Sequence, residues 1–302
     1  MATDSSLSDR LFAIGLDDDA SPLFRYTFYG TTLLILLISL FPFYYLVMLA
    51  LSKPGNTTQA GLLPAGFDPT SFIGAFQAVP FHLYMRNSLL IATGVTAFVL
   101  VFASLAGYTF GRMEFRGKRP LFLLLISVSY FPGATFIVGL FKLLTGNVTV
   151  LGVSSPNLFN SPAAVGLPLT ALSLPFAILL LTTFYSQIPD GLEDAARVTG
   201  TTRIGALYRI IAPLSAPGFV TAGILTFITA YNEFFFSQLM TTGSPQNWSP
   251  IVWGLLRYQT EVSVRYDLMA AASLIGVVPV ALIVLLAQRK IVSGLTSGSI
   301  KG

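Results

Sequence analysis

The sequence contains long stretches without a charged residue, and these constrain the fold more than any other feature. Five of them lie between Arg25 and Lys53, Arg86 and Arg112, Arg119 and Lys142, Arg209 and Glu233, and Asp267 and Arg289. Each is long enough for the roughly 20 apolar residues that cross a bilayer as a helix. A sixth candidate, residues 162–185, lies inside an uncharged segment that ends before Asp190.

These stretches predict an all-α, polytopic membrane protein with about six transmembrane helices. The expected spans cover residues 27–51, 87–111, 120–144, 162–185, 213–238 and 267–288. Only 10% of the 302 residues are charged, whereas a soluble domain carries roughly 25%. In the third span, Phe131-Pro132-Gly133 is expected to weaken the helix, because proline removes a backbone hydrogen bond.

The distribution of basic residues predicts how the chain is oriented in the membrane. With six spans both termini lie on one side, and the arm, loops and tail on that side carry twelve Lys and Arg against five on the other. The positive-inside rule therefore predicts that both termini lie in the cytoplasm of a multi-pass cell-membrane protein surrounded by lipid. We expect a cytoplasmic arm at 1–26, a transmembrane domain at 27–291 and a cytoplasmic tail at 292–302. The same loop bias accounts for the net charge of +4, so we expect no nucleic-acid partner.

The residue inventory offers little for catalysis or metal binding. The chain has no cysteine, and its one histidine, His82, has no neighbouring His or Cys, so we expect no metal site. It also lacks the Gly-x-x-x-x-Gly-Lys-Ser/Thr loop that holds nucleotide phosphates. We therefore expect neither a catalytic residue nor a bound cofactor on this chain.

The polar segment 188–213, hereafter the elbow, separates the fourth and fifth predicted spans. Asp190 and Glu193 have the spacing of a helix N-cap and its capping-box partner, and Gly200 stands where a helix commonly ends. Thr201 or Thr202 can cap a second short helix. One helix face carries small or apolar residues and the other is charged: Leu192, Ala195, Ala196 and Thr199 against Glu193, Asp194 and Arg197.

This helix–glycine–helix elbow is too polar to cross a bilayer, which leaves two interpretations. Its alanines permit close approach and its charges define a register, as suits a projection that enters a socket on a partner protein. Alternatively, it is an ordinary hairpin that lies on the lipid headgroups. The residues alone favour neither.

The elbow resembles the cytoplasmic signature of importer-type ABC permeases, Glu-Ala-Ala, three residues, Gly, nine residues, then Ile-x-Leu-Pro. Here the matching residues are Asp194-Ala195-Ala196, Gly200 and Ile210-Ile211-Ala212-Pro213, at the same spacing. Asp194 replaces the glutamate and Ala212 replaces the leucine, which weakens the transfer of individual roles. Residues 231–236, 267–273 and 292–298 are similar to the carbohydrate-importer branch of that family, so the likeness extends from the first span to the C-terminus.

The resemblance implies a transport subunit that performs no covalent chemistry. Its partners would be a second permease, different in sequence by family habit, two ATPase subunits that bind ATP and Mg, and an external solute-binding protein. The resemblance also implies that the elbow couples to an ATPase through Glu193, Asp194, Ala195, Ala196, Gly200 and Arg203. The tail, from Leu295 to Lys301, would reach between the ATPase subunits or lie free.

Two further sites follow from the resemblance together with the residues. Glu233 is the one acid inside a predicted span, and with Tyr231 and Asn232 it would line the sugar path or bond to a neighbouring helix. Asn247 and Trp248, in the last external loop, would contact the binding protein or anchor at the membrane interface.

Other functions stay open beside sugar import. A permease for a polyol or a glycerol phosphate would look the same. An ion-gradient-driven carrier would need ionisable residues inside the membrane, and Glu233 is the one acid there. A membrane assembly subunit would share the hydropathy but would leave the elbow motif unexplained.

Overall fold

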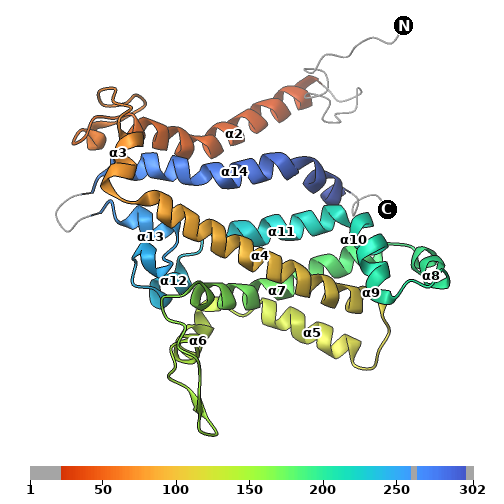
Figure 1. Cartoon of the computed structure of the whole chain (residues 1–302). Helices are drawn as coiled ribbons and strands as arrows, with labels where there is room; N and C mark the ends of the chain where they lie inside the picture. Colours follow the sequence, from red (N-terminus) through yellow and green to blue (C-terminus); the bar gives the residue numbers. More distant parts are fainter. Residues whose placement is uncertain (1–21, 260–263, 297–302) are drawn as a thin grey trace.

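A computed structural model describes residues 22–259 and 264–296, and these fold as a bundle of helices (Figure 1). The predicted arm falls largely on residues 1–21, and the end of the predicted tail on 297–302, both outside the described residues. Four long helices dominate: α2 (Pro22–Ala50), α4 (Phe81–Arg112), α7 (Pro162–Ser186) and α14 (Tyr266–Thr296). Shorter elements lie between them: η1 (Thr57–Gln59), α3 (Ser71–Ala78), α5 (Lys118–Ser129), η2 (Gly133–Phe136), α6 (Ile137–Leu144), β1 (Thr149–Val150), β2 (Val153–Ser154), α8 (Asp190–Val198), α9 (Arg203–Ala206), the π-helical turn η3 (Leu207–Ile211), α10 (Ala212–Leu214), α11 (Ala216–Tyr231), α12 (Phe235–Met240), η4 (Pro245–Asn247) and α13 (Ile251–Leu256).

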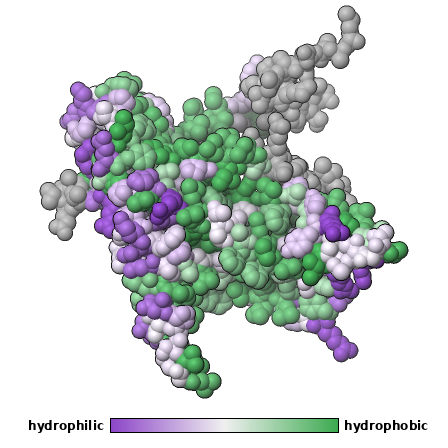
Figure 2. Space-filling model, viewed as in Figure 1, coloured by the Kyte–Doolittle hydropathy of each residue, from purple (hydrophilic) through white to green (hydrophobic). Residues whose placement is uncertain are grey.

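Within the described residues, four helices are long and apolar enough to cross a membrane, or five if one bent pair is counted as a span. They are α2, α4, α7 and residues 266–287 of α14, with α9–α10 and α11 as the bent pair. The predicted first, second, fourth and sixth spans therefore correspond to single helices, whereas the third and fifth do not. Hydrophobic residues cover the middle of the molecule and hydrophilic residues gather at its two ends (Figure 2).

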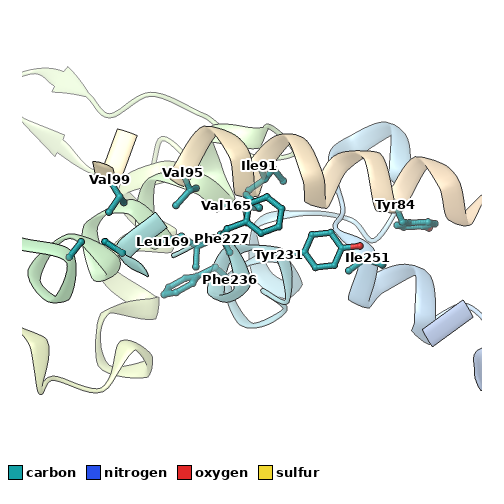
Figure 3. Close-up of a cluster of buried hydrophobic side chains, with 14 of the residues drawn as sticks. Tyr84, Ile91, Val95, Val99, Val165, Leu169, Phe227, Tyr231, Phe236 and Ile251 are labelled. Carbon is teal, nitrogen blue, oxygen red and sulfur yellow. The ribbon is translucent and has the colours of Figure 1, made fainter. Parts of the chain in front are cut away.

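The core lies between α4, α7 and α11, where small residues allow close packing. A Cβ atom on Gly107 of α4 would lie 3.0 Å from the Cβ of Leu181 on α7, so the two backbones approach at this glycine. Buried side chains from α4, α7, α11, α12 and α13 form one cluster, with Tyr84, Ile91, Val95, Val99, Val165, Leu169, Phe227, Tyr231, Phe236 and Ile251 labelled in Figure 3. This cluster packs α4, α7 and α11 together, and the candidate site lies at the ends of these three helices.

Helix α2 lies at the edge of the bundle and packs against α14 (Figure 1). Ala50 is its one buried residue, and apolar side chains from Leu33 to Ile38 are more than half exposed. Such a face suits a lipid or protein environment rather than water.

The third predicted span is broken where the sequence predicted weakness. Helix α5 ends at Ser129, and the chain resumes as η2 at Gly133 after Phe131 and Pro132. The fifth predicted span is broken twice. The segment Arg203–Leu214 meets α11 at an angle of 84°, and residues 232–234 then separate α11 from α12.

Candidate functional site

The elbow lies at one end of the bundle, between α7 and α11, and consists of α8, α9 and η3 (Figure 1). Helix α8 packs against α9 and η3, and α9 against η3. Both short helices predicted from the sequence are present, at Asp190–Val198 and Arg203–Ala206.

A cluster of polar side chains fastens α8 to the end of α4. Arg112 donates from Nε to Oε2 of Glu193 at 3.1 Å and from Nη1 to the carbonyl oxygen of Ile188 at 2.5 Å. Its Nη1 also forms an ion pair with Oδ1 of Asp190 at 2.8 Å. Tyr108, one turn earlier in α4, donates its hydroxyl proton to Oε1 of Glu193. The Arg112 and Glu193 side chains are only 4% and 11% exposed, so their charge-assisted bond is buried, whereas the Asp190 side chain is exposed.

This network corrects the predicted capping of α8. The N-cap is Pro189, which has no side-chain cap, and Asp190 is the first helical residue. Glu193 does not reach back to the helix start, because Arg112 and Tyr108 of α4 occupy its two oxygens. The capping-box prediction was therefore wrong, and Glu193 is a buried anchor rather than a charge presented outward.

The rest of α8 is open to solvent. Leu192, Asp194, Ala195 and Arg197 are exposed. Within the described ranges, Asp194, Arg197 and Arg203 have no ion-pair partner, whereas Arg112 has two. Asp194, Arg197 and Arg203 line a polar cavity of about 520 Å³ together with the Arg112 cluster.

The glycine of the motif ends α8 as predicted. Gly200 has a φ of +91°, and its N–H donates to the carbonyl of Arg197 at 3.0 Å, while Thr201 N–H donates to Ala196 at 3.1 Å. This pair of bonds is the Schellman arrangement, which needs a left-handed residue at the glycine position. Thr202 then caps α9 by accepting from Gly205 N–H at 3.1 Å, which decides between the two predicted capping threonines.

Two of the three residues predicted to line the sugar path point into the protein. Tyr231 is 1% exposed, and its hydroxyl donates to the carbonyl of Gly276 at 2.9 Å. Glu233 is buried and accepts from the N–H groups of Phe236 and Ser237 at the start of α12. Asn232 alone of the three is exposed.

The loop predicted to contact the binding protein is tied to α4. Asn87, fully buried, donates from Nδ2 to the carbonyls of Pro245 at 2.7 Å and Ser249 at 3.1 Å. Asn247 donates to Oγ1 of Thr242 at 2.7 Å, and Trp248 has a φ of +61°; both are half-buried. Among the residues described, no group of three or more His, Cys, Asp or Glu comes together as a metal site would require.

A bundle of membrane-capable helices with a polar elbow anchored at one end is the architecture that we expected for a membrane transport subunit of the permease class. Comparison with known proteins then names the family. The chain is 35% identical over 271 residues to the sulfoquinovosyl glycerol transport system permease protein of Agrobacterium fabrum, covering 89% of this chain and 91% of that protein. It is 31% identical over 273 residues to the trehalose/maltose transport system permease protein of Thermococcus litoralis, covering 89% and 94%. The chain belongs to the family of carbohydrate ABC transporter permease subunits.

A solved structure supports the fold independently. The chain superposes on a subunit of a bacterial ABC transporter involved in the import of the polysaccharide alginate, with a TM-score of 0.71, 18% identity and coverage of 95% of this chain and 99% of that one. At that identity the match shows the fold alone. No protein-family model matches the chain.

Sequence reasoning missed Arg112, which it counted only as a loop charge. Its position one turn after Tyr108, at the end of an uncharged helix, was the available signal, because residues four apart share a helix face.

Proposed function

We propose that this chain is one of two membrane-spanning permease subunits of an ATP-driven sugar importer, and that α8 couples it to an ATPase subunit. The observation that carries the proposal is the two-sided elbow: Glu193 is bound to Arg112 of α4, while Asp194 and Ala195 face outward without a partner among the described residues. A helix held this way can transmit a displacement caused by a partner protein to the helix bundle.

The proposed span count remains six. Helices α5 and α6 with η2 form one broken span, and α10, α11 and α12 form another, joining the four continuous helices. With six spans, the elbow and both termini lie on the cytoplasmic side, where the positive-inside rule places them.

The proposed substrate class is a sugar, because the relatives are named for sulfoquinovosyl glycerol and for trehalose and maltose. The proposed partners are a second permease, two ATPase subunits that hold ATP and Mg, and an external binding protein. A structural neighbour, the alginate ABC transporter, was solved in complex with a periplasmic protein bound to an alginate pentasaccharide. Asn247 and Trp248, in the loop that Asn87 holds, are the proposed contact on this chain.

Coupling is tested with the complex reconstituted with its binding protein. ATP hydrolysis is measured with maltose, trehalose and sulfoquinovosyl glycerol in turn. Gly200→Pro should abolish stimulation of ATP hydrolysis by the sugar and binding protein, since proline cannot adopt a φ of +91° or donate to Arg197. Gly55→Pro is the matched control, because Gly55 has a φ of +85° in open space far from the elbow.

Co-purification of the ATPase subunits checks that each variant assembles. Normal stimulation in an assembled Gly200→Pro complex would refute coupling through the elbow. Sugar uptake that persists without the ATPase would instead identify an ion-driven carrier.

A further inference from the structure

Two helix breaks meet beside α7. One separates α5 from η2 at Phe131 and Pro132, and the other separates α11 from α12 at residues 232–234. A Cβ atom on Gly133 of η2 would lie 3.2 Å from Cδ1 of Leu172 on α7 and 3.9 Å from Cζ of Phe236 on α12. Interrupted helices line substrate sites in several transporter folds, because backbone and side-chain polar groups are exposed there.

A cavity of about 450 Å³ opens at the second break. Its volume falls within the range of roughly 300–1,000 Å³ found for small-molecule sites. Aromatic rings form much of its wall, and Phe235 is 45% exposed. The lining comes from α7, α11 and α12 together, so it is a feature of the packed bundle rather than of one segment.

The cavity also presents uncharged polar groups with unused hydrogen-bonding capacity. The Asn232 amide and the Ser173 hydroxyl line it, and neither has a hydrogen-bond partner within residues 22–259 and 264–296. Thr229 donates to the carbonyl of Leu225 at 2.9 Å, which leaves its oxygen free to accept. An amide offers two donors and an acceptor, so the three side chains match a ligand rich in hydroxyl groups.

The lining of this cavity contains no basic residue. Glu233 is the one ionisable residue there, and its oxygens are occupied by the N–H groups of Phe236 and Ser237. An anion would therefore find no counter-charge, and the one carboxylate is already bonded within the protein. A neutral polyhydroxylated ligand finds both hydrogen-bonding groups and an aromatic surface.

We propose that this cavity is a sugar subsite contributed by this chain, with Asn232, Ser173 and Thr229 bonding to sugar hydroxyls and the Phe235 ring packing on a C–H face of the sugar. The assignment rests on the proposed import function and specifies it further. It moves the sugar contact away from Tyr231 and Glu233, which the fold uses internally.

The chain contains no cysteine, so single cysteines report on the cavity directly. Thr229→Cys and Ser173→Cys are introduced separately, and labelling of this chain by N-ethylmaleimide is followed by mass spectrometry in the complete reconstituted complex. The sugar is whichever of the neutral sugars maltose and trehalose the wild type imports. Sulfoquinovosyl glycerol carries a sulfonate, and import of this sugar alone would overturn the subsite, because the lining has no cation to bind it. Thr183→Cys on α7 is the matched control, because Thr183 is also exposed and donates to its own helix, at 3.0 Å, but lies outside the cavity lining.

At ten times its dissociation constant, the imported sugar should slow labelling at both cavity positions by about tenfold, and leave Thr183→Cys unchanged. Adding Asn232→Leu to Thr229→Cys should remove this protection and lower the amount of sugar imported per ATP hydrolysed. Asn232→Gln should restore part of both.

Normal import with equal labelling in the presence and absence of sugar would overturn the subsite alone. If the cysteines are labelled only after the second permease is removed, that subunit covers the cavity. This result would also overturn the subsite. A wild-type complex that imports none of these sugars with ATP would refute the sugar-import function, and the subsite with it.

Discussion

Arg112 and Glu193 lie 81 residues apart in the sequence, and their side chains join the last residue of α4 to the middle of α8 at 3.1 Å. The guanidinium also holds Asp190 and the backbone carbonyl of Ile188, so α8 is held at its first turn and at the segment leading into it. We infer that α4 and α8 move together, which makes α4 the helix that carries a displacement of the elbow into the bundle.

Replacing Arg112 should uncouple the complex. Arg112→Met leaves the buried Glu193 without its cation, and removing one member of a buried ion pair costs about 3 kcal/mol. We expect a lower melting temperature of the purified complex, and a loss of stimulated ATP hydrolysis of roughly fivefold or more. The double variant Arg112→Met with Glu193→Leu should recover much of the stability, because no uncompensated charge then remains on Glu193.

An exposed ion pair provides the control for this prediction. Lys118 and Glu114 are 2.8 Å apart, with the Glu114 side chain 91% exposed. Such pairs contribute about 0–1 kcal/mol, so Lys118→Met should behave as wild type. Equal effects of the two substitutions would contradict the anchoring role of Arg112.

The negative charge of Glu233 should not be needed for sugar transport. Its carboxylate accepts from the N–H groups of Phe236 and Ser237, so Glu233→Gln keeps one acceptor and should cost about 1 kcal/mol. We expect ATP-driven sugar uptake to continue in Glu233→Gln, with a small drop in melting temperature. Complete loss of uptake in a well-folded variant would point instead to a proton-binding carboxylate and a carrier mechanism.

Replacing Asn87 should disturb the conformation of the external loop to which it is hydrogen-bonded. Asn87→Leu leaves the carbonyls of Pro245 and Ser249 without their donor inside the protein, at a cost of roughly 1–3 kcal/mol. We expect weaker binding of the external binding protein to the complex in nanodiscs, measured by titration, with unchanged basal ATP hydrolysis. Asn147→Ser is the control, because the exposed Asn147 side chain bonds only to Thr145 nearby. Unaltered binding by Asn87→Leu would exclude this loop as the contact.

Gly218 tests the packing of α11 on α7. A Cβ atom there would lie 2.3 Å from two ring atoms of Phe184, so Gly218→Ala should destabilise the bundle by about 1–3 kcal/mol. Gly139→Ala, in α6 with nothing within 4 Å, should be neutral or stabilising. Thermal unfolding in detergent compares the two, and equal melting temperatures would show that α7 and α11 are not packed as described.

The fold could be predicted where hydropathy and local capping decide it. The predicted fourth span, 162–185, coincides with α7 at Pro162–Ser186, since Ser161 caps the helix and Pro162 occupies its first position. The break after Ser129 followed from Pro132. The break at residues 232–234 could not be predicted in this way, because that segment contains no proline or glycine. Glu233 stabilises the new helix start through its own side chain.

The elbow was predictable in its backbone but not in its contacts. Gly200 and Thr202 act through bonds within a few residues, so their spacing in the sequence predicted the two short helices. Whether Glu193 caps α8 or binds α4 depends on a residue 81 positions away, which no local pattern reports. The surroundings of the Asn232 amide likewise depend on how α7 and α12 pack, so the local sequence did not reveal them.

The two sides of α8 also separate what must be kept from what can be exchanged. Tyr108 and Arg112 hold the helix through Glu193, while Asp194, Ala195 and Arg197 are exposed. On the proposed coupling, altering those exposed side chains would change which motor the subunit accepts without repacking the α4–α7–α11 core. The elbow would then serve as an adaptor, so that the membrane domain and its energy source could diversify independently.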